Sequence, residues 1–444
     1  MASSDVVILG GGFAGLSCAA ALAAGGRRVV LLEKKPHLGG RAYSFTDQET
    51  GDVVDNGQHL FMGCYGQTRA FLSEIGTSER LNLAPGLRLD FADADGRRDA
   101  LSCPAWLGAP WHLAAGVLRL RGLSLRDKAA LVRLDASMRS LRRLNAMPAE
   151  LDRMTARQWL DGLGQTRRLQ SRLLDPVALG ALNEDPAVAA ATGLAQVLRH
   201  AFYRDAEGSR LGLAAVGLSD LYAGSARSFI ESRGGEIRLS CKVRGVSRGR
   251  VVCEGGEVIE AGTIVSTLPP WSLRCLELPP ELEGAWRTLE AAPIVSISLW
   301  LDRPVMTEPL LGLLGAEIQW IFNKTRLLSS GGSGQCLALV ISGARRWLAS
   351  SPRSLLELAR ADLGRCLPAF KKATIRRWLV IKEPFATLSP VPGSDAKRPA
   401  AVSAVSGFLF AGDWTQTGLP ATIESAVLSG RRAARLILEG KQHA

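Results

Sequence analysis

The first forty residues hold the feature that most constrains the fold, a glycine-rich turn between an apolar strand and a helix of small residues. Residues 6–9 are short, apolar and partly β-branched, which is typical of a buried parallel strand. Gly10, Gly12 and Gly15 follow with the spacing G-x-G-x-x-G, which permits a tight turn, a close backbone approach to a pyrophosphate and close helix packing. Residues 16–24 are that helix. The pattern predicts a βαβ unit that binds a dinucleotide.

A second apolar strand, residues 29–32, ends at an acid in the place expected for such a unit. The carboxylate of Glu33 can accept hydrogen bonds from a ribose 2′-hydroxyl, and it would repel the additional phosphate of NADP. The helix N-terminus offers its amides and its dipole to the phosphates. The cofactor contacts expected from this unit are Gly10, Gly12, Phe13, Ala14, Gly15, Glu33 and Lys34.

The motif Leu38-Gly39-Gly40-Arg41 follows this strand directly. With the first fingerprint, it resembles the large flavoprotein family that includes the amine oxidases and the phytoene desaturases; a surface loop with an arginine is the alternative. The resemblance implies FAD, held in part by Gly40 and Arg41. It also implies an α/β fold, in which a Rossmann-like FAD-binding domain with a parallel sheet accompanies a substrate domain of antiparallel sheet and helices.

Residues near the C-terminus also resemble this family. Residues 407–411 are an apolar strand that ends at Gly412-Asp413, and a helix begins near Thr422-Ile423. In the family, the Gly-Asp meets the ribityl hydroxyls, and the helix N-terminus stabilises negative charge on the flavin. The resemblance adds Gly57, Val243 (through its backbone), Gly412, Asp413, Thr422 and Ile423 to the cofactor contacts. Residues 407–426 contain no cysteine or histidine, so we expect the FAD to be non-covalent.

Within this family, the sequence departs from the amine oxidases. Their aromatic cage has a tyrosine where this chain has Thr422, and a cationic substrate needs such π faces. Residues 55–65, 387–399 and 412–426 instead resemble the hydroxysqualene dehydroxylases, the squalene-associated flavoproteins of bacterial hopanoid pathways. What this implies is the FAD-dependent, reductive removal of the allylic hydroxyl of hydroxysqualene, which gives squalene.

That reaction needs an acid, because hydroxide is a poor leaving group. His59 and Glu424 are ionisable residues on segments that the resemblance places beside the flavin, and Gln58 could hold the hydroxyl. We therefore expect His59, Gln58 and Glu424 to be catalytic, with His59 as the first choice for the acid. The alternatives are that His59 is a satisfied core histidine and that Glu424 only stabilises the first turn of its helix.

Length and the resemblance together predict an interleaved division of the chain. We expect FAD-binding segments at 1–90, 219–275 and 396–444, a helical part of the substrate domain at 91–218 and its sheet at 276–395. Residues 155–202 have a helical pattern that Pro176 and Pro186 should break. Residues 52–63 should form a strand, a glycine turn and an apolar returning strand.

The net charge of +12 points to nucleic acid, to a phospholipid surface or only to a basic proteome, and the sequence favours a membrane surface over nucleic acid. No basic run is interleaved with aromatic residues as nucleic-acid binding would require. Residues 112–143 hold eight basic residues and two acids beside leucines and tryptophans, a pattern typical of an interfacial helix. A solvated basic helix is the alternative. We expect a cytoplasmic protein that associates peripherally with the inner face of the membrane.

The remaining patterns concern metals, disulfides and electrons. The eight cysteines and five histidines form no metal-ligand spacing, so we expect no metal and no disulfide framework. We find no second dinucleotide fingerprint, since residues 331–334 (Gly-Gly-Ser-Gly) form a polar loop without the required helix. Electrons should therefore come from an external donor. Two other functions stay open: a desaturase or amine oxidase that oxidises its substrate, and a non-catalytic flavin-bound lipid carrier.

Overall fold

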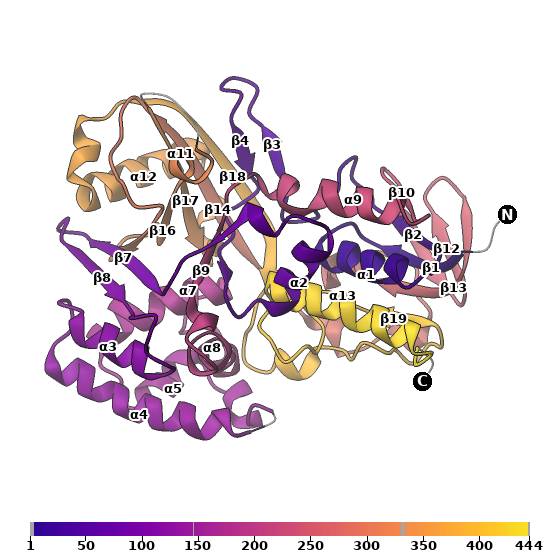
Figure 1. Cartoon of the computed structure of the whole chain (residues 1–444), viewed down its shortest axis with the longest axis horizontal. Helices are drawn as coiled ribbons and strands as arrows, with labels where there is room; N and C mark the ends of the chain where they lie inside the picture. The colour runs from indigo at the N-terminus through magenta and orange to yellow at the C-terminus, as the bar shows by residue number, and fades with distance from the viewer. Residues whose placement is uncertain (1–3, 145, 330–333, 443–444) are drawn as a thin grey trace.

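A computed structural model describes residues 4–144, 146–329 and 334–442 of the chain. The structure has two sheet-centred halves, and a group of helices lies beside one of them (Figure 1). The glycine and serine positions 331–333 of the expected polar loop lie outside the described residues.

The first half is built on a mostly parallel sheet with the order β10-β2-β1-β13-β12-β11, and β19 pairs with the end of β13. Residues 6–9 pair in parallel with both neighbours and are at most 1% exposed, as expected of a strand covered on both faces. This confirms the Rossmann-like part of the predicted fold. The strands are β1 (Ser4–Leu9), β2 (Val29–Leu32), β10 (Glu236–Arg238), β11 (Val243–Ser247), β12 (Arg250–Cys253), β13 (Val258–Ser266) and β19 (Phe408–Phe410).

Helices α1 (Phe13–Ala24), α9 (Gly224–Glu231) and α13 (Ile423–Leu438) cover one face of this sheet. Val6 and Ile8 pack toward them, whereas Val7 and Leu9 belong to the core on the other face. α1 and α13 come from opposite ends of the chain and touch through small residues. A Cβ added to Gly430 would lie only 2.1 Å from the carbonyl oxygen of Ala14.

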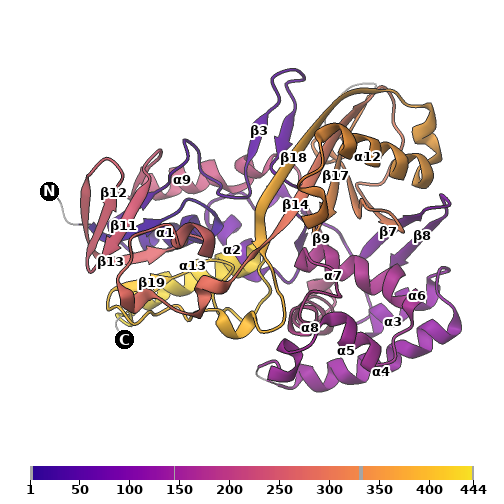
Figure 2. The same ribbon diagram turned by 180° about the vertical axis from the view of Figure 1, so that it is seen from behind.

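The second half is a mostly antiparallel sheet with the order β18-β14-β17-β16-β15-β7-β8, in which, among the described residues, only β7 and β15 pair in parallel. Figure 2 shows its strands β18, β14 and β17 side by side. α12 (Pro352–Cys366) covers one face, and the helical group covers the other. The antiparallel substrate sheet expected from the resemblance is thus present. Its strands are β7 (Arg88–Asp93), β8 (Arg98–Ser102), β14 (Ala291–Leu301), β15 (Leu310–Leu314), β16 (Trp320–Asn323), β17 (Gln335–Ser342) and β18 (Ile375–Leu388).

The helical group consists of α3 (Trp111–Arg119), α4 (Leu125–Arg142), α5 (Ala156–Gly162), α6 (Arg167–Leu169), α7 (Asp175–Leu182) and α8 (Ala191–Val197). α4 begins with a capping box formed by Ser124 and Asp127. The expected break at Pro176 is wrong. Pro176 lies in the first turn of α7 after a π-helical stretch, Gln170–Leu174, whose wider turn accommodates the missing N–H. Within the described residues, no helix combines the length and apolarity that crossing a bilayer requires.

Small sheets connect the two halves, and residues 52–63 form the expected strand, glycine turn and apolar return. β4 (Val53–Asp55) pairs with β3 (Ser44–Thr46), whereas β5 (Phe61–Met62) pairs with β9 (Leu211–Ala214) and not with β4. Because Gly57 has a φ of +87°, the chain turns out of the first ladder and enters another sheet. β6 (Leu81–Leu83) completes that sheet, and the remaining helices are α2 (Gly66–Glu74), α10 (Pro270–Leu273) and α11 (Lys324–Leu327).

The close contact between α1 and α13 leads us to predict how one substitution changes the stability of the protein. Gly430→Ala should lower the free energy of unfolding by about 1–3 kcal/mol, because the methyl group has no room against Ala14. Gly364→Ala in α12 is the matched control. A Cβ there meets nothing within 4 Å, so the better helix former should stabilise the protein by about 1 kcal/mol. Denaturant unfolding measures both, and equal stabilities would contradict the close packing.

Candidate functional site

The turn after β1 is closed by direct contact between two glycines. A Cβ on Gly15 would lie 1.9 Å from the carbonyl oxygen of Gly10, and Gly10 itself has a φ of +104°. α1 begins after Gly12, which provides no side-chain cap, so the first helical amides are left for an external acceptor. The turn therefore presents backbone N–H groups and a helix dipole to an anion such as a pyrophosphate.

Glu33 lies at the end of the neighbouring strand and is held in one orientation. Its Oε2 accepts a hydrogen bond from the amide of Gly11 at 2.7 Å, and its Oε1 accepts one from the amide of Lys35 at 2.9 Å. The carboxylate is buried, and each oxygen keeps a lone pair for a ribose hydroxyl. Lys34, by contrast, lies on the surface.

The Gly-Gly-Arg turn packs against this fingerprint. A Cβ on Gly40 would lie 3.1 Å from the Cα of Gly12, and both Gly39 and Gly40 have positive φ. The hydroxyl of Tyr222 lies within hydrogen-bonding distance of the carbonyl oxygens of Gly39 (2.8 Å) and Ala42 (3.0 Å), and this contact stabilises the turn. The two motifs are therefore parts of one backbone cradle.

Arg41 connects the start of the chain to its end. Its Nη2 donates to Asp413 Oδ1 at 2.7 Å, and its Nη1 donates to the carbonyl oxygen of Ala386 at 3.0 Å. Asp413 follows β19 and is buried. The structure thus brings the predicted contacts Gly40, Arg41, Gly412 and Asp413 together at the edge where β1 ends.

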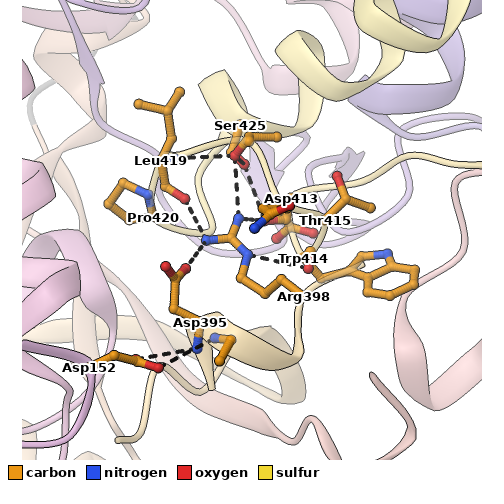
Figure 3. Close-up of polar contacts among 12 residues, drawn as sticks. Asp152, Asp395, Arg398, Asp413, Trp414, Thr415, Leu419, Pro420 and Ser425 are labelled. Carbon is orange, nitrogen blue, oxygen red and sulfur yellow. Dashed lines mark hydrogen bonds and ion pairs between the residues drawn. The ribbon is translucent and has the colours of Figure 1, made fainter. Parts of the chain in front are cut away.

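The loop after Asp413 is organised by a buried guanidinium, Arg398 (Figure 3). This side chain donates to the carbonyl oxygens of Leu419 (2.7 Å), Asp413 (2.9 Å) and Trp414 (3.3 Å). Its charge is balanced by Asp395 at 3.0 Å, and the carboxylate of Asp152 in turn accepts the amides of residues 395 and 396. One arginine therefore sets the shape of the segment that leads into Thr422, Ile423 and α13.

Gln58 and His59 follow the Gly57 turn and lie near Arg41. The side-chain amide of Asn56 donates to the carbonyl oxygen of Arg41, and Gln58 Nε2 donates to Asp55 Oδ2 at 3.2 Å. Desolvation by burial, with a smaller contribution from Arg41, lowers the pKa of His59 to about 4, against the opposing effect of Asp55. The imidazole is therefore mostly neutral at pH 7.

Glu424 lies in the first turn of α13 and has structural partners. Its carboxylate accepts hydrogen bonds from the amides of Gln67 (2.8 Å) and Thr68 (2.9 Å) and from the hydroxyl of Thr68 (2.8 Å). Burial raises the pKa of this carboxyl, and the three donors act in the opposite direction. Glu424 thus joins α13 to the N-terminus of α2.

Two residues that organise the site were not found from the sequence. Arg398 and Lys324 are buried cations; Arg398 donates to carbonyl oxygens of the loop at 413–419, and Lys324 pairs with Asp55, which is far away in the chain. No local pattern marks them, because an isolated arginine or lysine is usually exposed. Val243, expected from the resemblance, lies buried in β11, which follows the residues that bond to Glu33.

These features define a class of protein. An uncapped helix N-terminus, a fixed acid after β2 and a Gly-Asp at the end of β19 fit the pyrophosphate, ribose and ribityl parts of FAD. The class is an FAD-binding oxidoreductase fold with a separate substrate sheet.

Comparison with known proteins agrees with this class. The chain belongs to the flavin containing amine oxidoreductase family, whose model matches residues 13–438. It is 31% identical to a hydroxysqualene dehydroxylase of Rhodopseudomonas palustris over 98% of this chain and 99% of that protein. It is 25% identical to a 15-cis-phytoene desaturase of Synechococcus elongatus over 98% and 95% of the two chains. Among solved structures, a putrescine oxidase is similar with a TM-score of 0.75, at 17% identity over 99% of each chain.

The Arg398 network makes a prediction about cofactor binding. Arg398→Met should weaken FAD binding by about 10-fold or more, because the buried carbonyl oxygens of Asp413 and Trp414 lose their donor at about 1–3 kcal/mol each and that of Leu419 loses its donor as well. Arg435→Met, an exposed position on α13, is the control and should bind FAD normally. The measurement is titration of the apoprotein, with bound flavin counted after acid release. Equal affinities of the two variants would contradict the role of Arg398.

Proposed function

We propose that this protein is an FAD-dependent oxidoreductase that reductively removes the allylic hydroxyl of hydroxysqualene to give squalene. The observation that carries the proposal is the chain-long similarity to a hydroxysqualene dehydroxylase. The absence of a tyrosine at Thr422 supports an apolar substrate over an amine.

Reduced FAD would supply the hydride that replaces the departing oxygen at the allylic carbon. The chain itself has to bind the hydrocarbon, hold the hydroxyl and provide a proton to it. Gln58 and His59 are the polar side chains next to Gly57, in a turn that contacts Arg41 through Asn56. We assign the hydroxyl to Gln58 and the proton to His59.

The protonation state of His59 sets a condition on this assignment. With a pKa of about 4, roughly one imidazole in a thousand carries the additional proton at pH 7. Glu424 is the alternative donor, and its three hydrogen bonds to α2 support a structural part instead. We therefore keep His59 as the first choice.

The remaining parts of the proposal concern the cofactor's attachment and its electrons. FAD is held non-covalently, since residues 407–426 offer no cysteine or histidine for attachment. The chain carries a single dinucleotide fingerprint, so we infer that electrons reach the flavin from a separate donor. The interleaved domain boundaries given above belong to the same proposal.

We also propose that the protein docks on the inner face of the membrane through α3, α4 and the residues around them. Large apolar side chains are exposed here, among them Trp106 (81%), Leu125 (83%) and Val132 (68%). Basic side chains surround them, and Arg139 lies over the ring of Trp111. Exposed apolar groups among basic ones suit the boundary of an anionic bilayer.

The function is tested by anaerobic mixing of the photoreduced protein with hydroxysqualene. We expect reoxidation of the flavin in a single turnover and the formation of one squalene per flavin. An oxidising desaturase or amine oxidase would leave reduced flavin unchanged under these conditions, and a lipid carrier would bind without any spectral change. Either result would refute the dehydroxylation.

His59→Ala should retain FAD and slow this turnover by about 10²–10⁴-fold, the usual range for a lost general acid. The wild-type rate should rise as the pH falls from 7 toward about 4, because protonation of the imidazole increases in that direction. The variant should lose this pH dependence. Near-normal rates in His59→Ala together with loss in Glu424→Gln would make Glu424 the acid.

Membrane docking is tested with vesicles. The wild-type protein should bind anionic phosphatidylglycerol vesicles in a salt-sensitive manner, since each basic side chain near such a surface contributes about 1 kcal/mol. The double variant Leu125→Ala/Val132→Ala should bind more weakly, and Val258→Ala, an exposed apolar position on the FAD-binding half, should bind normally. Equal binding of the wild type to neutral phosphatidylcholine vesicles would contradict the proposal.

A further inference from the structure

A buried ion pair joins the substrate sheet to the turn that carries Gln58 and His59. Lys324 Nζ lies 2.5 Å from Asp55 Oδ2, and the two side chains are only 6% and 5% exposed. Lys324 follows β16 directly, and Asp55 ends β4. Burying a pair of charges costs desolvation free energy, which suggests that this ion pair has a role beside the turn.

The carboxylate of Asp55 is surrounded by donors. Its Oδ1 accepts hydrogen bonds from the hydroxyl of Ser44 (2.7 Å) and the amide of Leu218 (3.0 Å). Its Oδ2 accepts from Lys324 and from the side-chain amide of Gln58. An aspartate paired with an ammonium group has no proton to donate, so every neighbour must present a donor to it.

This requirement decides how the amide of Gln58 is turned. A glutamine side chain has a donating end and an accepting end of nearly equal shape, and its hydrogen-bond network determines which end points where. Because Asp55 only accepts, the NH₂ group of Gln58 faces Asp55. The Oε1 of Gln58 therefore faces away from the carboxylate and is available as an acceptor.

The contacts of the turn place Gln58 Oε1 in the structure. Gln58 is part of the turn that bonds to Arg41 through Asn56, and Arg41 bonds to Asp413. Gly57, the preceding residue, leaves only Ser296 Oγ within 4 Å of the position of a Cβ. The turn therefore lies between the cofactor segments and β14 of the substrate sheet.

We propose that Lys324 and Asp55 are positioning residues that hold the Gln58 amide in one orientation, with Oε1 directed at the hydroxyl of the substrate. The inference rests on the proposed function, since it takes the hydroxyl as the partner of Oε1. Gln58 accepts the hydroxyl hydrogen, which leaves the lone pairs of the oxygen free for the proton that makes it a leaving group. A reversed amide would present N–H to those lone pairs and compete with that proton.

The charges matter because a neutral partner would not decide the orientation. An asparagine at position 55 could either accept from Gln58 or donate to it, so both orientations of the Gln58 amide would be populated. The variant Lys324→Met/Asp55→Asn removes both charges at nearly constant volume and leaves no uncompensated ion. It therefore separates orientation from burial of a single charge.

The experiment is a cycle of anaerobic single turnovers with hydroxysqualene, with the FAD content and the thermal midpoint recorded for each variant. Gln58→Leu and Lys324→Met/Asp55→Asn should each slow the turnover at saturating substrate by about 10–100-fold, the range typical of lost orientation. The triple variant should be no slower than Gln58→Leu, because the pair acts through Gln58. Lys324→Arg keeps the charge and should stay within a few-fold of the wild type.

Each result supports or overturns the inference. Losses that multiply in the triple variant, or a wild-type rate in Gln58→Leu, overturn it while the proposed function stands. If the neutral pair loses FAD, Gln58→Leu and Lys324→Arg decide alone. A slow Gln58→Leu beside a near-normal Lys324→Arg supports the inference, and a Lys324→Arg as slow as Gln58→Leu overturns it. Absence of any wild-type turnover overturns both the proposed function and the hydroxyl as the partner of Oε1.

Discussion

The parallel pairing of β13 with β1 on one side and β19 on the other is the constraint on which the site depends. Leu9 pairs with Ser266, and Ser266 pairs with Phe410, so three segments that lie far apart in the chain end at the same edge of one sheet. The carboxyl ends of parallel strands present free backbone groups and loops at that edge. The glycine fingerprint follows β1, Glu33 and the Gly-Gly-Arg turn follow the neighbouring β2, and Gly412-Asp413 follows β19.

Close backbone contact is what gives the cradle its shape. Gly15 against Gly10, Gly40 against Gly12 and Gly430 against Ala14 leave no room for side chains, so strand, turn and the helices α1 and α13 are held at fixed distances. Charged groups then fix the parts that are not in regular structure. Arg41 binds Asp413, and Arg398 donates hydrogen bonds to the carbonyl oxygens of the following loop.

The two halves are joined at the Gly57 turn. The Gly57 turn leaves the β3–β4 ladder, contacts Arg41 and receives Lys324 from the end of β16. The buried carboxylate of Glu184 likewise pairs with the half-exposed Arg345 and accepts a hydrogen bond from the hydroxyl of Ser389, so that the helical group is joined to the substrate sheet by polar contacts. Such contacts are directional, which suits them to hold the halves in register around a reaction site.

By itself, the sequence determined the strand–turn–helix unit at the start of the chain, because its glycines, its acid and its strand–helix periodicity are local and each has a direct physical meaning. The βαβ unit and the residues Gly10, Gly12, Gly15 and Glu33 could be predicted for that reason, whereas Arg41, Asp413 and the two-domain fold came from the family resemblance. Only the tertiary structure decided the partner of β5, the continuity of the chain at Pro176, and the burial of Arg398 and Lys324. Those depend on contacts between distant residues, and a side chain's environment cannot be derived from its neighbours in sequence. The roles of Gln58, His59 and Glu424 stay predictions, since they depend on where substrate and flavin meet these side chains.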